Sequence, residues 1–177
     1  MELTSARINK LIKAIDAEKQ ALLLVDERDS TYTFCNGEVP VRPNYDFNAV
    51  SDRISTLNER VMLLRHALNS FNVSHILPCG YTIDKAIIRM SQLECEKKRL
   101  MKRASVPATE RVRGYNAINP DYTAVNYELK DAKKRLNDVC KEIASLQLEL
   151  DSENCTVPIE TGLTQREIED INYTVNA

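Results

Sequence analysis

The sequence predicts a mainly α-helical protein whose long antiparallel helices form a coiled-coil-like bundle, with a small β-ribbon and a short C-terminal helix. The 177-residue chain has only 4 Gly and 6 Pro, no Trp and 6% aromatic residues, a composition that disfavours all-β folds. Its apolar share of 43% is sufficient to bury a core. Two segments also repeat apolar residues at alternating intervals of four and three, which is typical of helices packed lengthwise.

The first helix is expected over residues 4–24, where apolar residues recur near one face at the helical period. They are Ile8, Leu11, Ile12, Ile15, Leu22 and Leu23. The period then changes to the alternation of a strand, and Asn36–Gly37 is a dipeptide that favours a tight hairpin turn. These features predict a β-ribbon over residues 31–41, in which Pro40 restricts the second strand to an edge.

Two heptad patterns predict the long helices of the bundle. The first, over residues 46–71, consists of Val50, Ile54, Leu57, Val61, Leu64, Leu68 and Phe71. The second, over residues 122–152, consists of Val125, Leu129, Ala132, Leu136, Val139, Ile143, Leu146 and Leu150. The residues expected to carry the packing are Leu57, Leu64, Leu136, Val139 and Ile143.

A further helix is expected over residues 83–103, after a loop that contains Pro78 and Gly80. Thr82 is its expected N-cap residue. Because the loop between this helix and the preceding one is short, the two helices are predicted to lie antiparallel, as a hairpin.

We assign residues 1–156 to one helical domain, which includes a basic loop over residues 104–121. Residues alternate in this loop as in a strand, and we expect it to pair with the ribbon near Phe34. Residues 157–177 are predicted to be a C-terminal arm. A capping box at residues 164–167 indicates a short helix within it.

The heptad stripes require a partner, because an isolated helix leaves its apolar stripe exposed to water. Each buried Leu or Ile contributes on the order of 1.5–3 kcal/mol, so we expect both internal packing and self-association into a homo-oligomer. Apolar residues away from the stripes, at residues 22–24, 62–63 and 148, are candidates for subunit contacts. The alternative is a wider internal face in a monomeric bundle.

Charge and targeting features favour a cytoplasmic protein without membrane or extended nucleic-acid partners. Lys and Arg number 24 against 26 Asp and Glu, so no overall field attracts polyanions. No apolar run approaches the ~20 residues that cross a bilayer. The N-terminal residues lack the apolar core of a secretory signal. The five cysteines show no C-x-x-C spacing, and we expect reduced thiols.

No catalytic or metal-binding constellation is recognised, so we predict a non-enzymatic protein without cofactor or metal. His66 and His75 lack carboxylate or cysteine neighbours at ligand spacing. The chain has no P-loop, nucleophile elbow, dinucleotide-binding glycine motif or H-E-x-x-H sequence.

One basic segment, residues 97–113, contains seven cations and a single acid, Glu110. Guanidinium groups bind phosphate bidentately and aromatic rings stack on bases, so this segment is a candidate site for an anionic small molecule such as a nucleotide, at a subunit interface. The candidate ligand-binding residues are Arg111, Arg113, Tyr115, Arg103 and Lys102. The alternative is that these cations only offset the negative dipole of a helix C-terminus.

Several short motifs resemble those of the bacterial septicolysin-like family of small helical proteins, over roughly residues 50–156. They are the Asn69-x-x-Asn72 step, the helix start Gly80-x-Thr82, Arg89 in the next helix, a basic segment with Arg111 and Arg113, and a long helix followed by Thr156. This sequence has Met90 and Cys155 where the family pattern favours Asp and Trp. The resemblance implies a mostly helical, oligomerising fold of uncharacterised function.

Overall fold

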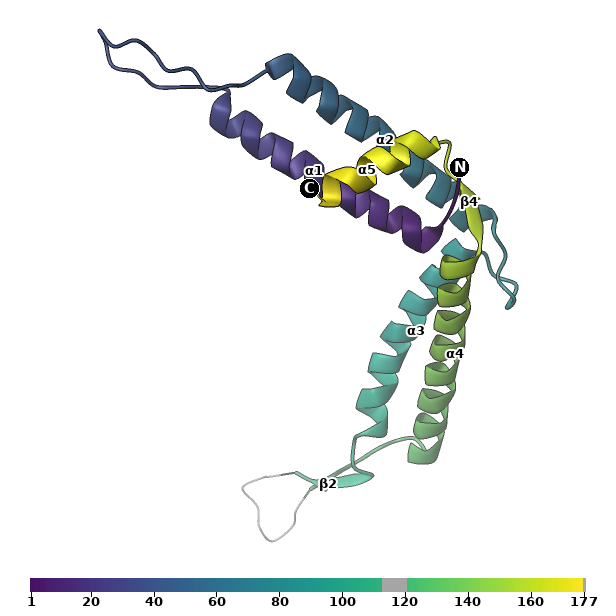
Figure 1. Ribbon diagram of the computed structural model, residues 1–177. Coiled ribbons are helices and arrows are strands. Elements are labelled where there is room, and N and C mark those ends of the chain that lie inside the picture. Colours follow the sequence, from purple (N-terminus) through teal and green to yellow (C-terminus); the bar gives the residue numbers. More distant parts are fainter. Residues whose placement is uncertain (113–120, 177) are drawn as a thin grey trace. The chain divides into compact units, whose positions relative to one another are not determined.

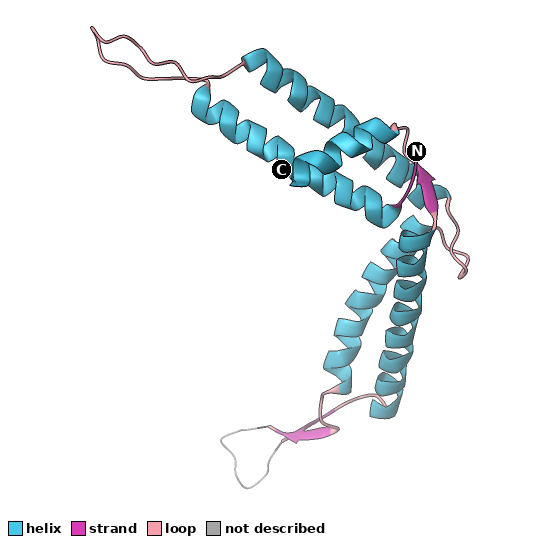
Figure 2. Cartoon of the chain, in the orientation of Figure 1, coloured by secondary structure: helices cyan, strands magenta, loops and turns pink. Residues whose placement is uncertain are grey.

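The computed structural model describes residues 1–112 and 121–176 and is mainly α-helical (Figures 1 and 2). The elements in chain order are β1 (Glu2–Thr4), α1 (Ser5–Asp29), α2 (Phe47–Ser74), α3 (Ile83–Ala104), β2 (Thr109–Arg111), β3 (Tyr122–Ala124), α4 (Leu129–Thr156), β4 (Pro158–Glu160) and α5 (Gln165–Asn176). They form two compact units. Unit 1 comprises residues 1–72 and 153–177, and unit 2 comprises residues 73–152.

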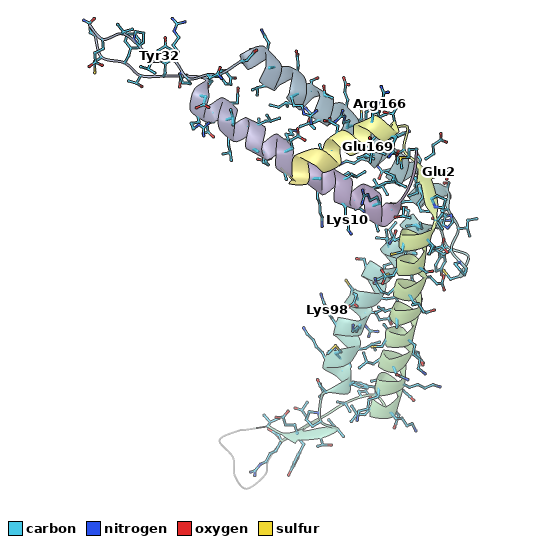
Figure 3. All side chains as sticks on the ribbon, in the orientation of Figure 1. Glu2, Lys10, Tyr32, Lys98, Arg166 and Glu169 are labelled. Carbon is cyan, nitrogen blue, oxygen red and sulfur yellow. The ribbon has the colours of Figure 1, made fainter. Side chains whose placement is uncertain are left out.

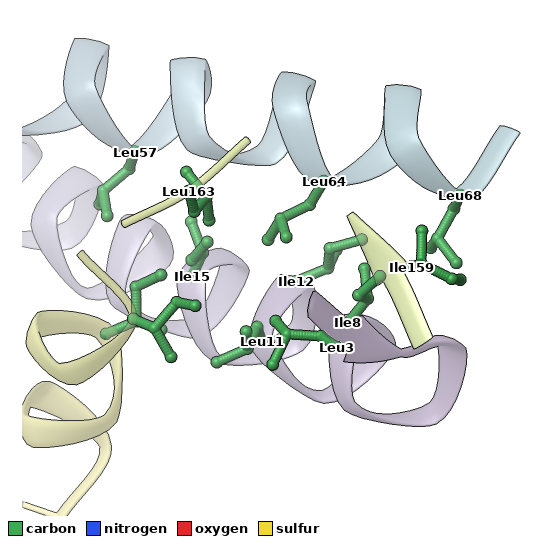
Figure 4. Packing of buried hydrophobic residues seen from close by; sticks show 12 residues of the cluster. Leu3, Ile8, Leu11, Ile12, Ile15, Leu57, Leu64, Leu68, Ile159 and Leu163 are labelled. Atoms are coloured by element: carbon green, nitrogen blue, oxygen red, sulfur yellow. The ribbon is translucent and has the colours of Figure 1, made fainter. Parts of the chain in front are cut away.

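Unit 1 is built on the pair of long helices α1 and α2, with α5 packed against α1 (Figure 1). Thr4 begins α1 by accepting a hydrogen bond from the backbone N–H of Arg7 at 3.3 Å, as an N-cap residue does. Side chains from α1, α2, β1, β4 and α5 then form one apolar core (Figure 4). Its buried members are Leu3, Ile8, Leu11, Ile12, Ile15, Leu57, Leu64, Leu68, Ile159, Leu163, Ile168 and Ile171.

The structure divides the chain differently from the sequence-based boundary at residue 156. Residues 157–177, expected to form an arm, contribute β4 and α5 to unit 1. Strand β4 pairs antiparallel with β1, with Leu3 opposite Ile159, so the first and last strands form one small sheet. The predicted capping box is present, since the Glu167 carboxylate accepts a hydrogen bond from the backbone N–H of Thr164 at 2.8 Å.

Charged side chains also hold α5 to the two long helices. The guanidinium of Arg60 donates to the Asp170 carboxylate at 2.6 Å, and that of Arg53 donates to the same oxygen at 2.9 Å. Arg53 also donates to Glu18 on α1 at 2.7 Å. These hydrogen bonds hold the pKa of Asp170 below its usual range, because they stabilise the ionised carboxylate.

Unit 2 is a hairpin of α3 and α4. The predicted hairpin of α3 with the preceding helix is wrong, because that helix, α2, belongs to unit 1, where its apolar stripe packs in the core with α1. Helices α3 and α4 lie side by side (Figure 1), and an ion pair joins Arg89 on α3 to Glu142 on α4 at 2.8 Å. Thr82 is the N-cap of α3, since its hydroxyl accepts from the backbone N–H of Lys85 at 3.3 Å. Before it, Gly80 adopts a φ of +86°, which suits glycine in a tight turn.

The prediction of a β-ribbon over residues 31–41 is wrong. Asn36 and Gly37 do form a turn, but no strand flanks it on either side. Val39 and Val41 are 91% and 90% exposed, so strands here would cover no apolar face. Pro40 also lacks the backbone N–H that a ladder requires.

The ribbon of this protein lies instead between α3 and α4, where β2 pairs antiparallel with β3. The basic loop therefore does not pair with the segment near Phe34 as expected. Because residues 122–124 serve as β3, α4 begins at Leu129 and not at residue 122. Tyr122 and Thr123 are residues that favour strands, which agrees with their place in β3.

None of the helices in the described part of the chain combines the length and the apolar character that spanning a bilayer requires.

Candidate functional site

Over most of its length, the packing stripe of the α3–α4 hairpin uses one deeply buried residue in every seven. On α3 these deep residues are Ala86, Leu93 and Leu100, and on α4 they are Ala132, Val139 and Leu146. At the second heptad position Ile83 and Leu150 are also buried, toward the start of α3 and the end of α4, whereas Met90, Leu136 and Ile143 are only half-buried. The heptad pattern is therefore present, but its two positions are not equivalent in the hairpin.

Helix geometry assigns the flanking residues to two different sides of this stripe. The half-buried heptad residues, together with the residue after each deep residue, lie on one side. The residue that directly precedes each half-buried heptad residue in the sequence lies on the opposite side of the stripe. Arg89 and Glu142 both belong to the second group and pair with each other, which confirms that the equivalent sides of the two helices coincide.

The first side, which we call the apolar side, carries apolar residues along both helices. They are Ile87, Met90 and Met101 on α3, and Leu136, Cys140 and Ile143 on α4. Two ionic residues of α3 interrupt it, with the Lys97 ammonium 3.2 Å from the Glu94 carboxylate. Lys133 is exposed on the α4 part of this side.

The second side, which we call the charged side, carries ionic residues. Besides the Arg89–Glu142 pair, the Glu149 carboxylate accepts a hydrogen bond from the backbone N–H of Cys79 at 3.0 Å. The hydrogen bond to Glu142 raises the pKa of Arg89. Arg103 and Arg135 extend this side toward the β2–β3 ribbon.

An open groove of about 710 Å³ lies on the charged side, where the hairpin meets the ribbon. The last turns of α3, the segment from β3 to α4 and the first turns of α4 line it. Its apolar lining residues are Leu100, Val106, Ala124, Val125 and Ala132. Its polar and charged lining residues are Arg99, Arg103, Thr123, Asn126, Tyr127, Glu128, Asp131 and Arg135.

Hydrogen bonding fixes one wall of the groove and leaves two cations available. The Tyr127 hydroxyl donates to the backbone carbonyl of Arg103 at 2.8 Å, which ties the segment before α4 to the end of α3. Arg99 lies 3.5 Å from the Glu96 carboxylate. Within the described ranges, Arg103 and Arg135 have no salt bridge of 4.0 Å or less.

Of the three sequence-predicted ligand residues that the structure describes, one lines this groove, namely Arg103. Lys102 is exposed on the last turn of α3 but does not line the groove, and Arg111 is exposed on β2. Arg113 and Tyr115 lie outside the described residues.

Sequence reasoning missed Arg135, because it belongs to a helix that begins beyond the basic segment. The signal that identifies it is the spacing of seven between Arg135 and Glu142, which places both residues on the charged side.

Comparisons with known proteins place this chain in a structural class without assigning a function. No family model matches it, and the search of curated proteins finds no match. Among solved structures, the chain is similar to a functionally unknown conserved protein from Corynebacterium diphtheriae, with a TM-score of 0.58 and 14% sequence identity. The match covers 90% of this chain and 100% of the other. At this identity, the similarity shows a shared fold alone.

Proposed function

We propose that this chain is a non-enzymatic, cytoplasmic protein that acts by self-association, and that two copies meet through the apolar sides of their α3–α4 hairpins. The observation that supports this is that the second heptad position is only half-buried along the middle of both helices, at Met90, Leu136 and Ile143. A two-helix hairpin has one line of contact, whereas a second hairpin packed on the apolar side completes a four-helix bundle. Each apolar side chain so covered gains part of the roughly 1.5–3 kcal/mol of full burial.

The charges on the apolar side suit a second copy of the same chain. Glu94 and Lys97 already neutralise each other within one α3, and the remaining cation, Lys133, lies at an exposed position. Two such sides therefore meet without a concentration of like charge. The chain as a whole has a formal net charge of only -2, which also opposes association weakly.

The first test replaces Leu136 by Asp. This change places an unpaired charge on the apolar side, where association would bury it at a large desolvation cost, so we expect loss of the folded oligomer. Native mass spectrometry gives the subunit number and circular dichroism gives the helix content. A variant that kept both its helicity and its oligomer mass would contradict the proposal.

A matched pair on α3 separates association from folding. Ile87 lies on the apolar side and is 51% exposed, whereas its neighbour Ile88 lies on the outer face and is 52% exposed. Both sites accept a glutamate without burying it in the monomer. We expect Ile87→Glu to dissociate the oligomer and Ile88→Glu to leave its mass unchanged. Equal masses for the two variants, or a monomeric wild-type protein, would overturn the proposal.

A second candidate function is the capture of an anionic small molecule by the basic segment. The position of Arg103 in the groove, without an ion pair to a described residue, favours it. The sequence assigns Arg111, Arg113 and Tyr115 to this role, at a subunit interface. Changing Arg111 and Arg113 to Ala should then weaken binding in titration calorimetry with little change in thermal stability. Equal affinities for wild type and double variant would exclude that assignment.

A further inference from the structure

Building on the second candidate function, we propose that the groove of unit 2 binds a small monophosphate ester with a flat apolar body, and that Arg103 and Arg135 hold its phosphate. Arg103 comes from the last turn of α3, and Arg135 comes from the second turn of α4. Both line the same groove. Neither guanidinium forms a salt bridge to a described residue, so their donors are free to meet the paired oxygens of a phosphate.

The balance of charge in the groove selects the ligand class. Among the described residues, three arginines and two carboxylates, Glu128 and Asp131, line the groove, which leaves a small positive excess. Such an excess suits one phosphate group and does not suit a triphosphate or a nucleic-acid strand, whose several charges would meet the two carboxylates. Arg99 forms an ion pair with Glu96, so we assign Arg103 and Arg135 as the phosphate ligands.

The apolar lining provides the place for the ligand body. Leu100 and Ala132 are buried at the end of the packing stripe, and Val125 is half-buried beside them. The hydrogen bond from Tyr127 to the end of α3 restrains its ring at this lining. An aromatic ring so held offers a stacking surface for a flat ligand. A volume of about 710 Å³ is in the range of small-molecule sites.

The probe for this site is adenosine 5′-monophosphate, titrated into the full chain by calorimetry. Adenosine and inorganic phosphate are the two partial probes, because each has one half of the proposed ligand. We expect measurable binding of the monophosphate and binding that is weaker by about tenfold or more for either half alone. We also expect adenosine triphosphate to bind no more tightly than the monophosphate.

A pair of double variants with equal charge changes tests the residues. Arg103→Ala with Arg135→Ala should weaken monophosphate binding by about tenfold or more, since charge-assisted hydrogen bonds are lost. Lys98→Ala with Lys134→Ala removes the same charge from exposed positions on the same two helices, outside the groove. Lys98 projects from α3 on the side away from α4 (Figure 3). We expect this second variant to keep wild-type affinity within about twofold.

Each outcome decides between specific assignments. Equal losses in the two double variants would show a general charge effect and overturn the site, and absence of monophosphate binding to wild type would overturn the ligand class. Loss of binding on changing Arg111 and Arg113, with none on changing Arg103 and Arg135, would keep the second candidate function and refute the groove. Native mass spectra of the same variants report self-association separately.

Discussion

Ile171 on α5 is the residue whose replacement tests how the C-terminal segment is integrated into unit 1. Its side chain is fully buried in the core formed with α1 and α2. If residues 157–177 were a loosely attached arm, shortening this side chain would change little. Because Ile171 is a core residue, Ile171→Ala is expected to destabilise the whole of unit 1.

The magnitude follows from the atoms removed. Ile171→Ala deletes the equivalent of about three buried methylene groups, each of which contributes about 0.8 kcal/mol, and leaves a cavity whose cost adds to this loss. The expected decrease in the free energy of unfolding is therefore about 3 kcal/mol. For a cooperative unit of roughly 100 residues, this corresponds to a Tm lower by about 12–24 °C.

The assay is thermal unfolding followed by circular dichroism, combined with hydrogen exchange over α1 and α5. The matched control is Ile88→Ala, the same chemical change at a half-exposed helix position, with an expected effect within about 0.5 kcal/mol. Faster exchange in α1, distant in sequence from residue 171, is the specific sign of a shared core. Wild-type Tm and unchanged exchange in α1 would refute the integration of α5.

Two further predictions concern individual polar groups. Asp170 has a lowered pKa in the folded state, so its contribution to stability is present above its unfolded pKa and is lost as pH falls through the folded value. Asp170→Asn should therefore lower the unfolding free energy measured in urea at pH 7, and its difference from wild type should shrink near pH 3; an equal difference at both pH values would contradict this. Thr82→Ala should cost about 1 kcal/mol by removing the N-cap acceptor of α3, whereas Thr82→Ser should retain wild-type stability. Equal Tm values for the two Thr82 variants would exclude the cap.

The fold class was predictable from the sequence because the heptad patterns are local. Leu57, Leu64 and Val139 are buried as expected, since helical spacing alone puts them on the packing face. Leu136 and Ile143 have equally suitable side chains, yet they are half-buried. Which of the two heptad positions lies deeper depends on how the partner helix packs. The sequence of one helix does not determine this.

The predictions that failed share one reason: the elements concerned depend on contacts between residues that are far apart in the sequence. Asn36 and Gly37 form the turn that the dipeptide indicates, but a turn yields a ribbon only when its flanks cover an apolar surface. Conversely, residues 157–177 have no long apolar pattern. Residues 158–171 belong to unit 1 because Ile159 pairs opposite Leu3 and Ile171 lies in the core, contacts that no local signal reveals.

The candidate site was predictable only in part, for the same reason. The excess of cations at the end of α3 is visible in the sequence and identifies Arg103. Arg135 is contributed by the facing helix, surrounded by charges of both signs. Tyr127 is placed by a hydrogen bond to a backbone carbonyl, which leaves no trace in the residue pattern.

The pairing of β1 with β4 makes unit 2 an insertion between two parts of unit 1. The entropy lost on closing a chain segment grows only with the logarithm of its length, so doubling the inserted segment costs about 0.6 kcal/mol. Lengthening or shortening α3 and α4 together by whole heptads would preserve the phase of their contacts. The length of the α3–α4 hairpin can therefore change at small thermodynamic cost while the core of unit 1, which includes β1 and β4, stays the same.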